Sequence, residues 1–234
     1  MTVSEVLALL EAERDERGVR HWERLGDATG GLRSVGLGLT RLRQLAKQIG
    51  RDRTLAGALW GSDLYEARVL ALLIDDPAQL TRAQAEHQVE HLDGGQLAHV
   101  FASCDATLAK APFVVELAEA WVRSADPVRR DCGHGLLYEI SKFSGRKAPA
   151  EGWFLQQVER IAAEIDTAPE RVRLAMGAAL MGIGKRSAAL NAAALRVAQA
   201  TGPIAFTSAS GECEPFDVAK HLSNERLRAK LGLA

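Results

Sequence analysis

Short helix-start signals recur along the whole chain, and they constrain its fold more than any other feature of the sequence. The clearest are three capping-box patterns and one Asp-Pro pair: Thr2-x-x-Glu5, Thr81-x-x-Gln84, Thr167-x-x-Glu170 and Asp126-Pro127. Between such signals, apolar residues recur at intervals of three and four, the period of a helix face. The sequence therefore predicts roughly ten to twelve helices joined by short turns.

The predicted helices favour an array of helix pairs over a mixed fold. Leu42, Leu45, Ala46 and Ile49 illustrate the spacing, since all four lie on one helical face. The connections are only a few residues long, so neighbouring helices should pack antiparallel, as they do in solenoids. Aromatic residues make up 5% of the chain and β-branched runs are scarce. We expect an all-α fold with very little strand, built as one domain over residues 1–234.

Charge is unevenly distributed along a nearly neutral chain. The formal net charge is −1, so the chain lacks the overall basic excess of a dedicated nucleic-acid binder. Residues 41–53, however, hold five basic residues and one acid, and residues 171–211 contain no acidic residue. This segregation could form a positive face on a neutral molecule, and a solvated surface with uneven charge is the alternative.

Cysteine usage and hydropathy indicate a reducing, aqueous compartment. Cys104, Cys132 and Cys213 are an odd number at wide spacings, which predicts neither a disulfide framework nor a zinc ribbon. For Cys104, burial in a helix is favoured over a role as nucleophile. No apolar run approaches the roughly 18 residues of a membrane span, and the N-terminus is acid-rich. We expect a cytoplasmic protein that contacts no membrane.

Two short motifs suggest chemistry but have simpler explanations. His87-Gln-Val-Glu90-His91 matches the inverted zinc-protease pattern, yet it lies in a polar helix and no third ligand can be assigned, so a solvated helix face is favoured. Gly182-Ile-Gly184-Lys185-Arg186-Ser187 is similar to the end of a phosphate loop. It lacks a preceding strand, and a helix C-terminus followed by basic residues explains it better. We expect no metal and no cofactor.

A row of cations on one predicted helix has the spacing of a phosphate-binding surface. Arg43 and Lys47 are four residues apart, and Arg51 falls one further turn along. One helical face could therefore present three positive charges to a nucleic-acid backbone, where counterion release favours each contact.

Several segments occur in an order and spacing that resemble the DNA alkylation repair family, whose members are HEAT-like helical solenoids. They are Leu42-Arg43-x-Leu45-Ala46-Lys47, Leu55-Ala56-x-x-Leu59-Trp60, Tyr65-Glu66-Ala67-Arg68-x-Leu70-Ala71, Asp76-Pro77, Lys110-x-Pro112-Phe113, Trp121 and Gly184-Lys185-Arg186. Cys213 falls near a cysteine common in the C-terminal tails of the family. The resemblance covers about residues 40–220 and implies a HEAT-like helical-repeat solenoid.

The resemblance also implies an activity and a pair of residues to perform it. Glycosylases of this family remove cationic N3- or N7-alkylated purines from duplex DNA, using tryptophan for cation–π contact and a carboxylate four residues later. The direct alignment places Leu97 and Phe101 at these two positions. A shifted alignment places Phe101 and Asp105 there, which makes Asp105 the catalytic candidate. A second family tryptophan corresponds to Ala178.

Basic residues in or next to the matching segments are the predicted DNA contacts: Arg43, Lys47, Arg68, Arg129, Arg130, Lys142, Lys185 and Arg186. For Arg68, an ion pair near Glu66 or with a neighbouring helix is an equal alternative. The leading hypothesis is a monomer that binds duplex DNA through a basic concave face. The other hypothesis is a noncatalytic protein-interaction scaffold with the same fold.

Overall fold

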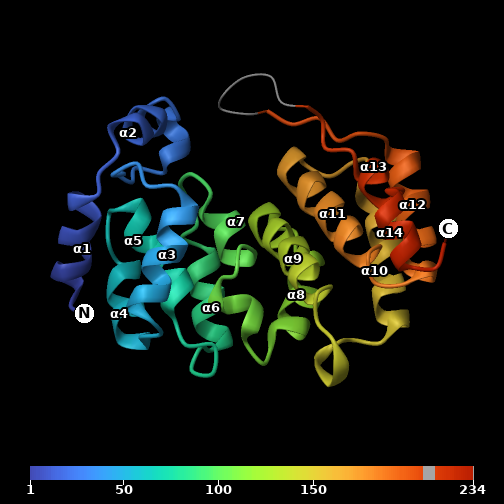
Figure 1. The fold of residues 1–234 in the computed structure, drawn as a ribbon, viewed down its shortest axis with the longest axis horizontal. Helices are drawn as coiled ribbons and strands as arrows, with labels where there is room; N and C mark the ends of the chain where they lie inside the picture. The colour runs from blue at the N-terminus through green and yellow to red at the C-terminus, as the bar shows by residue number, and fades with distance from the viewer. Residues whose placement is uncertain (208–213, 234) are drawn as a thin grey trace. The chain divides into compact units, whose positions relative to one another are not determined.

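The computed structural model describes residues 1–207 and 214–233, and no β-strand occurs among these residues. They form fourteen α-helices and three short 3₁₀ turns (Figure 1). The expected all-α fold is therefore confirmed. The helices outnumber the predicted ten to twelve because several are very short, such as α7, α13 and α14 with five or six residues each. Cys213 lies outside the described residues.

The chain divides into two compact units, residues 1–114 and 115–234. The prediction of one domain over the whole chain stays a prediction. Unit 1 contains the following helices and turns: α1 (Val3–Ala12), α2 (Glu16–Glu23), η1 (Gly26–Thr29), α3 (Leu39–Ile49), α4 (Arg53–Trp60), α5 (Tyr65–Ile74), α6 (Arg82–Val89), α7 (Leu97–Ala102) and η2 (Thr107–Lys110).

Helix α5 is the centre of unit 1. It packs against α3, α4 and α7, and most of its residues are buried, including Leu70 and Ile74. Leu42 and Leu45 bury the predicted apolar face of α3 against this core. The basic residues of α3 lie on its opposite face. The spacing of the apolar residues therefore also determines that the charged side chains point away from the core.

A carboxylate at the start of α5 orders the glycine-rich segment before α3. The side chain of Glu66 is completely buried. It accepts hydrogen bonds from the hydroxyl of Ser34 at 2.6 Å and from the backbone N–H groups of Val35, Gly36 and Leu37 at 2.9 to 3.2 Å. Four donors compensate the loss of hydration of a buried charge, so the loop and α5 stabilise each other.

Unit 2 begins at the second residue of α8 (Val114–Val122) and contains the remaining helices: α9 (Pro127–Ile140), η3 (Gly145–Lys147), α10 (Glu151–Glu164), α11 (Glu170–Ile183), α12 (Ala188–Thr201), α13 (Val218–Leu222) and α14 (Glu225–Lys230). Of the helix pairs in unit 2, α9 and α11 pack against each other most extensively. Gly182 permits this approach, because a Cβ atom there would lie 2.4 Å from the hydroxyl oxygen of Ser141. Phe154 and Met176 fill the core between neighbouring helices.

Three of the four helix-start signals are confirmed. Thr2 forms a complete capping box with Glu5, Thr81 caps α6, and Asp126 caps α9 ahead of a first-turn proline. The signal at Thr167 is wrong. Helix α11 begins at Glu170 after Pro169, and the Thr167 hydroxyl instead donates to the Glu164 carbonyl at the end of α10.

Candidate nucleic-acid interface

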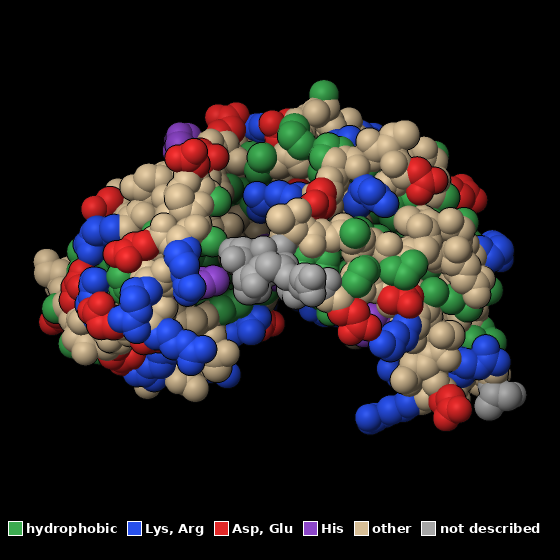
Figure 2. All heavy atoms as spheres, turned by 90° about the horizontal axis from the view of Figure 1, so that it is seen from above, with side chains coloured by type: hydrophobic (Ala, Val, Ile, Leu, Met, Phe, Trp, Pro, Cys, Tyr) green, Lys and Arg blue, Asp and Glu red, His purple; other side chains and the backbone are tan. Residues whose placement is uncertain are grey.

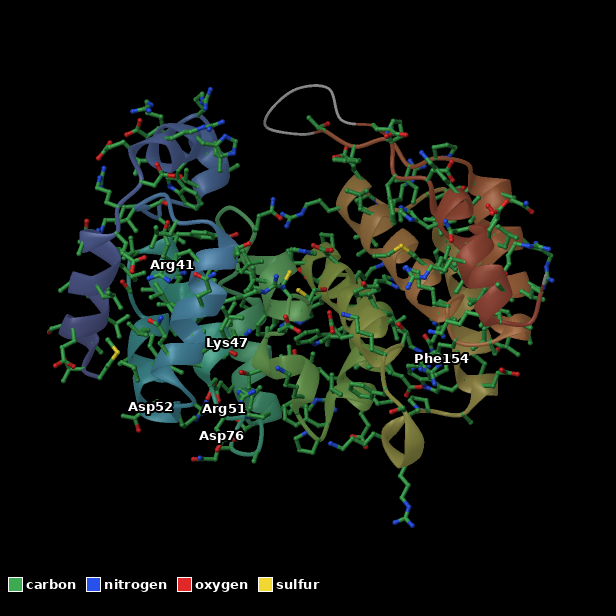
Figure 3. All side chains as sticks on the ribbon, viewed as in Figure 1. Arg41, Lys47, Arg51, Asp52, Asp76 and Phe154 are labelled. Atoms are coloured by element: carbon green, nitrogen blue, oxygen red, sulfur yellow. The ribbon has the colours of Figure 1, made fainter. Side chains whose placement is uncertain are left out.

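Helix α3 carries two of the predicted DNA contacts on one face. Arg43 and Lys47 are one turn apart, so their side chains extend side by side. The helix ends at Ile49 because Gly50 adopts a φ of 78°, which favours glycine. Arg51 therefore lies beyond the helix instead of on its next turn. Figure 3 shows it just past the end of α3, below Lys47 in that view.

The turn after α7 brings Asp105 to the same place. Cys104 and Asp105 both have left-handed backbone conformations, with φ values of 58° and 68°. The Asp105 side chain is 73% exposed, and its Oδ2 lies 3.5 Å from Nη2 of Arg43. Lys110 Nζ donates to the Asp105 carbonyl at 3.0 Å, which holds the turn. Cys104 is half-buried in this turn, so the expected burial in a helix is wrong, because α7 already ends at Ala102.

These residues surround one pocket of about 490 Å³ in unit 1. Its lining consists of Arg43, Ala46, Lys47, Gly50, Arg51, Leu73, Asp105 and Lys110. Four cations thus face a single carboxylate, which gives the pocket a local positive charge on a chain whose net charge is −1. On the face drawn in Figure 2, Lys and Arg side chains are mixed with Asp and Glu side chains. No single sign of charge covers that face.

The cations of this pocket differ in their partners. Arg51 is fixed, because it donates to the Asp75 carbonyl and to the hydroxyl of Thr107 at 3.2 Å. The Nε atom of Arg43 is buried and has no hydrogen-bond acceptor in the described part of the chain. Lys47 is exposed and has neither a hydrogen bond nor an ion pair among the described residues. Lys47 is therefore the side chain most able to reach an outside phosphate.

The two positions of the direct alignment lie inside unit 1. Leu97 is 0% and Phe101 is 1% exposed, and both belong to α7. In the shifted alignment Phe101 would supply the aromatic face and Asp105 the carboxylate. Only Asp105 reaches the surface, so the structure does not bring these two side chains together around an exposed base-binding position. Ala178, in α11, is part of unit 2.

Arg68 is held locally at the start of α5. Its Nε donates to the Ser62 carbonyl at 2.8 Å, its guanidinium carbon lies 5.6 Å from the ring centroid of Trp60, and Nη1 lies 3.5 Å from the His91 carbonyl. The alternative for Arg68 was an ion pair near Glu66. The Glu66 carboxylate instead accepts hydrogen bonds from residues 34–37. The guanidinium is half-buried and bound to backbone carbonyls, which limits its reach toward DNA.

A second basic pocket, of about 720 Å³, lies in unit 2 between the end of α9, the turn η3 and the end of α11. Its cations are Lys142, Lys185, Arg186 and Lys230, and its lining includes no acidic side chain. Three of the predicted DNA contacts therefore meet in one place. Their sequence positions lie up to 44 residues apart, so only the packing of α9 against α11 joins them.

The residues of this second pocket are also unequal. The Arg186 guanidinium donates to the carbonyls of Ser141 and Phe143 and lies 4.3 Å above the ring centroid of Phe154. Lys142 pairs with Glu139 at 2.8 Å and lies over the ring of Tyr138. Lys185 has no partner among the described residues. Burial, followed by the charge of Lys142, lowers the pKa of the Lys185 amine.

Arg129 and Arg130 lie in the first turn of α9 and outside both pockets. Arg130 forms an ion pair with Glu164 at 2.9 Å, and its side chain is only 19% exposed. This pair joins α9 to the end of α10. Arg129 is half-exposed and takes part in interactions within the chain.

The two motifs that suggested other chemistry are ordinary helix features. His87 and His91 lie on the exposed face of α6 and the turn after it, and the Nδ1 of His91 is 2.9 Å from the carbonyl of His87. Within residues 1–207 and 214–233, no group of three side chains could hold a metal ion. Gly184 ends α11, and Ser187 caps α12. No helix in the described chain is long and apolar enough to cross a membrane.

Two cations of these pockets were missed by the sequence prediction of contacts. Lys110 belongs to a matching segment but was not assigned a role, and Lys230 lies in the final helix, beyond the resemblance. A signal for Lys110 was present, since it follows the Cys104–Asp105 pair by a few residues. No local signal could have placed Lys230 beside Lys142.

Comparisons with known proteins agree on the family and on the fold. The family described as DNA alkylation repair enzyme matches residues 6–210. No curated protein matches the sequence significantly. A solved structure superposes with a TM-score of 0.83 at 21% identity, covering 99% of this chain and 97% of the other. It comes from proteins described as a new family related to the HEAT-like repeat DNA glycosylases, with affinity for branched DNA structures. The expected HEAT-like fold is confirmed.

Proposed function

Because the chain belongs to the DNA alkylation repair enzyme family, we propose that it binds duplex DNA through phosphate contacts at the basic pocket of each unit. The observation that carries the proposal is the unit 1 pocket, where Arg43, Lys47, Arg51 and Lys110 surround one opening. Cations grouped in this way match the repeated charges of a nucleic-acid backbone. Of these residues, Lys47 makes the first contact.

Base excision is not part of the proposal. Recognition of a cationic purine by stacking needs an exposed aromatic face, whereas Phe101 is buried and Leu97 has no ring. Asp105 alone could stabilise positive charge on a sugar, but it is 73% exposed and no aromatic side chain accompanies it in the lining of its pocket. The protein therefore recognises DNA structure and leaves its bases in place.

Branched DNA is the substrate form that we add to this proposal. The structurally similar protein comes from a family described as having affinity for branched DNA structures. A chain with two separate basic pockets could contact more than one backbone segment. We therefore include a three-way junction beside linear duplex among the ligands to be tested. The expected cytoplasmic location and monomeric state belong to the same proposal.

Fluorescence anisotropy with labelled duplex and three-way junction, at several salt concentrations, tests the binding. Four phosphate contacts would give a slope of log K against log salt of about −3.6. Lys47→Glu should weaken binding to both ligands, and Lys220→Glu, at an exposed residue outside both pockets, is the matched control. Absence of measurable affinity for either ligand at low salt would overturn the proposal. It would favour the alternative function, a protein-interaction scaffold.

Release of 7-methylguanine from methylated DNA tests the statement about excision. We expect no release above the spontaneous rate from the native protein. Release that disappears in Asp105→Asn would contradict us and would restore Asp105 to the catalytic role that the shifted alignment assigns to it.

A further inference from the structure

The ion pair between Arg43 and Asp105 is loose, and it leaves half of the guanidinium unused. Its N–O distance is 3.5 Å, longer than a charge-assisted hydrogen bond. The Arg43 side chain is 38% exposed, yet its Nε is buried without an acceptor among the described residues. An arginine fork is satisfied best by two oxygens of one anion, and Asp105 supplies only a distant one.

The other groups around Asp105 also fit an incoming anion. Lys47 lies one turn from Arg43 and has no partner in the described chain. Lys110 is bound to the backbone carbonyl of Asp105 and not to its carboxylate, so the turn stays anchored when the side chain moves. Arg51 is fixed by Asp75 and Thr107 as one wall of the pocket. The Asp105 side chain is 73% exposed and can turn away into water.

We propose that Asp105 is a displaceable counterion, and that a phosphate group of DNA replaces its carboxylate on Arg43. The phosphate would accept from the Nη end of the guanidinium, where Nη2 now faces Asp105, and would be close to Lys47. In the free protein the carboxylate neutralises part of the pocket. This inference rests on the proposed function and names the ligand group and the residue that competes with it.

The proposal makes the opposite prediction from a catalytic or supporting role for Asp105. Asp105→Asn removes the competing charge and should strengthen DNA binding by about three- to tenfold at low salt, since an exposed ion pair of this kind is weak. Asparagine is the appropriate replacement because, like aspartate, it tolerates a φ of 68°. Asp63→Asn is the matched control. It has 72% exposure and an ion pair with Arg33, in the same unit but outside the pocket, and should change affinity less than twofold.

A double-mutant cycle tests whether the gain in DNA affinity of Asp105→Asn depends on Arg43. In an Arg43→Lys background the charge remains but the fork is lost, so Asp105→Asn should gain at most half as much as in the native protein. The Nε–H resonance of Arg43 should also shift when DNA is added. Thermal unfolding of each variant verifies that it is folded before its affinity is measured.

Two further arms identify the source of the phosphate. A gain that is equal for duplexes with 5′-phosphate and 5′-hydroxyl ends supports an internal phosphodiester, and a gain confined to the phosphorylated duplex supports a terminal phosphate. Weaker or unchanged DNA binding by Asp105→Asn would overturn the inference. If Lys47→Glu still weakens binding in that case, the proposed function stands without it.

Discussion

The two basic pockets contain the same number of cations but manage their charge differently. In unit 1 a carboxylate, Asp105, faces the cations and offsets part of their field. In unit 2 no acidic residue lines the pocket, and burial, followed by the charge of Lys142, lowers the pKa of the Lys185 amine. The acid that offsets charge thus faces the opening in unit 1, whereas in unit 2 Glu139 pairs with Lys142 from outside the lining. The arrangement in unit 1 can be reversed by a ligand that displaces the acid.

The interiors of the two units show a similar contrast. Unit 1 buries the carboxylate of Glu66 with four hydrogen-bond donors. Unit 2 buries the imidazole of His134 in α9, and neither ring nitrogen has a hydrogen-bond partner among the described residues. Burial, with the charges of Arg130 and Arg160, lowers the pKa of His134 to about 3. One unit satisfies its buried charge, and the other keeps its buried base neutral.

At neutral pH the largest effect should come from removing the satisfied charge. Glu66→Ala leaves the backbone N–H groups of Val35 and Leu37 and the Ser34 hydroxyl without their acceptor, so we expect a loss of about 4 kcal/mol in the free energy of unfolding. Urea denaturation followed by circular dichroism measures it. Asp63→Ala, which removes an exposed ion pair in the same unit, should cost less than about 1 kcal/mol. Equal losses in the two variants would mean that burial of Glu66 is not what stabilises unit 1.

The neutral imidazole of unit 2 predicts a loss of stability in acid. Because the folded-state pKa of His134 is about 3 and its usual value is 6.5, its contribution is complete above pH 6.5. As pH falls from 6.5 toward 3, the unfolded state binds the proton first, and stability should fall by up to about 1.4 kcal/mol per pH unit. Chemical denaturation at several pH values should show a much flatter dependence for His134→Leu.

A neighbouring acid should partly hide that slope. Burial raises the pKa of Asp131 to about 6 from a usual value of 3.8, against the opposing charge of Arg171. Its contribution to stability is present below pH 3.8 and lost as pH rises through 6, the reverse of His134. Asp131→Asn should therefore steepen the acid loss between pH 4 and 6. If Asp131→Asn and the native protein show the same pH profile, the two groups do not compensate each other.

A smaller effect distinguishes a cation that holds the fold from one that can meet DNA. Arg186→Lys keeps the charge but loses the fork that binds two carbonyls and the stacking on Phe154, so unfolding should become easier by about 2 kcal/mol. DNA affinity should change less than twofold in anisotropy measurements. A larger loss of affinity without a loss of stability would assign Arg186 to the DNA contact.

The smallest effect compares the two pockets directly. Lys185→Ala and Lys47→Ala should each weaken duplex binding by several-fold and reduce the salt slope by about 1. The loss should be larger for Lys185, because no carboxylate lines its pocket, and Lys220→Ala is the control. An effect from only one of the two lysines would restrict the DNA contact to one unit.

Helix-level features were predictable from the sequence because they depend on neighbouring residues. The apolar face of α3 fixed the direction of Arg43 and Lys47, and three capping signals are confirmed at their helices. Thr167 failed because Pro169, two residues later, moved the start of α11. Local rules thus hold until a stronger local signal competes with them.

The composition of the pockets was not predictable in the same way. Asp105 reaches Arg43 only because two consecutive residues adopt left-handed backbone conformations, which no residue type at these positions demands. Arg186 was predicted as a DNA contact from its charge, whereas its hydrogen bonds to Ser141 and Phe143 depend on how α9 meets α11. The partner of a charged side chain is a property of tertiary packing.

The buried Glu66 also sets an order of events during folding. The backbone groups that it binds precede it by 29 to 31 residues, so the loop at 35–37 stays without its acceptor until α5 forms. A buried carboxylate without donors is costly, so the loop and the start of α5 become ordered in a single step. Helices α1 and α2 lie ahead of that loop in the chain. Because the N–H of Asp15, at the start of α2, donates to the Val35 carbonyl in that loop, α2 takes its final place only when α5 has formed.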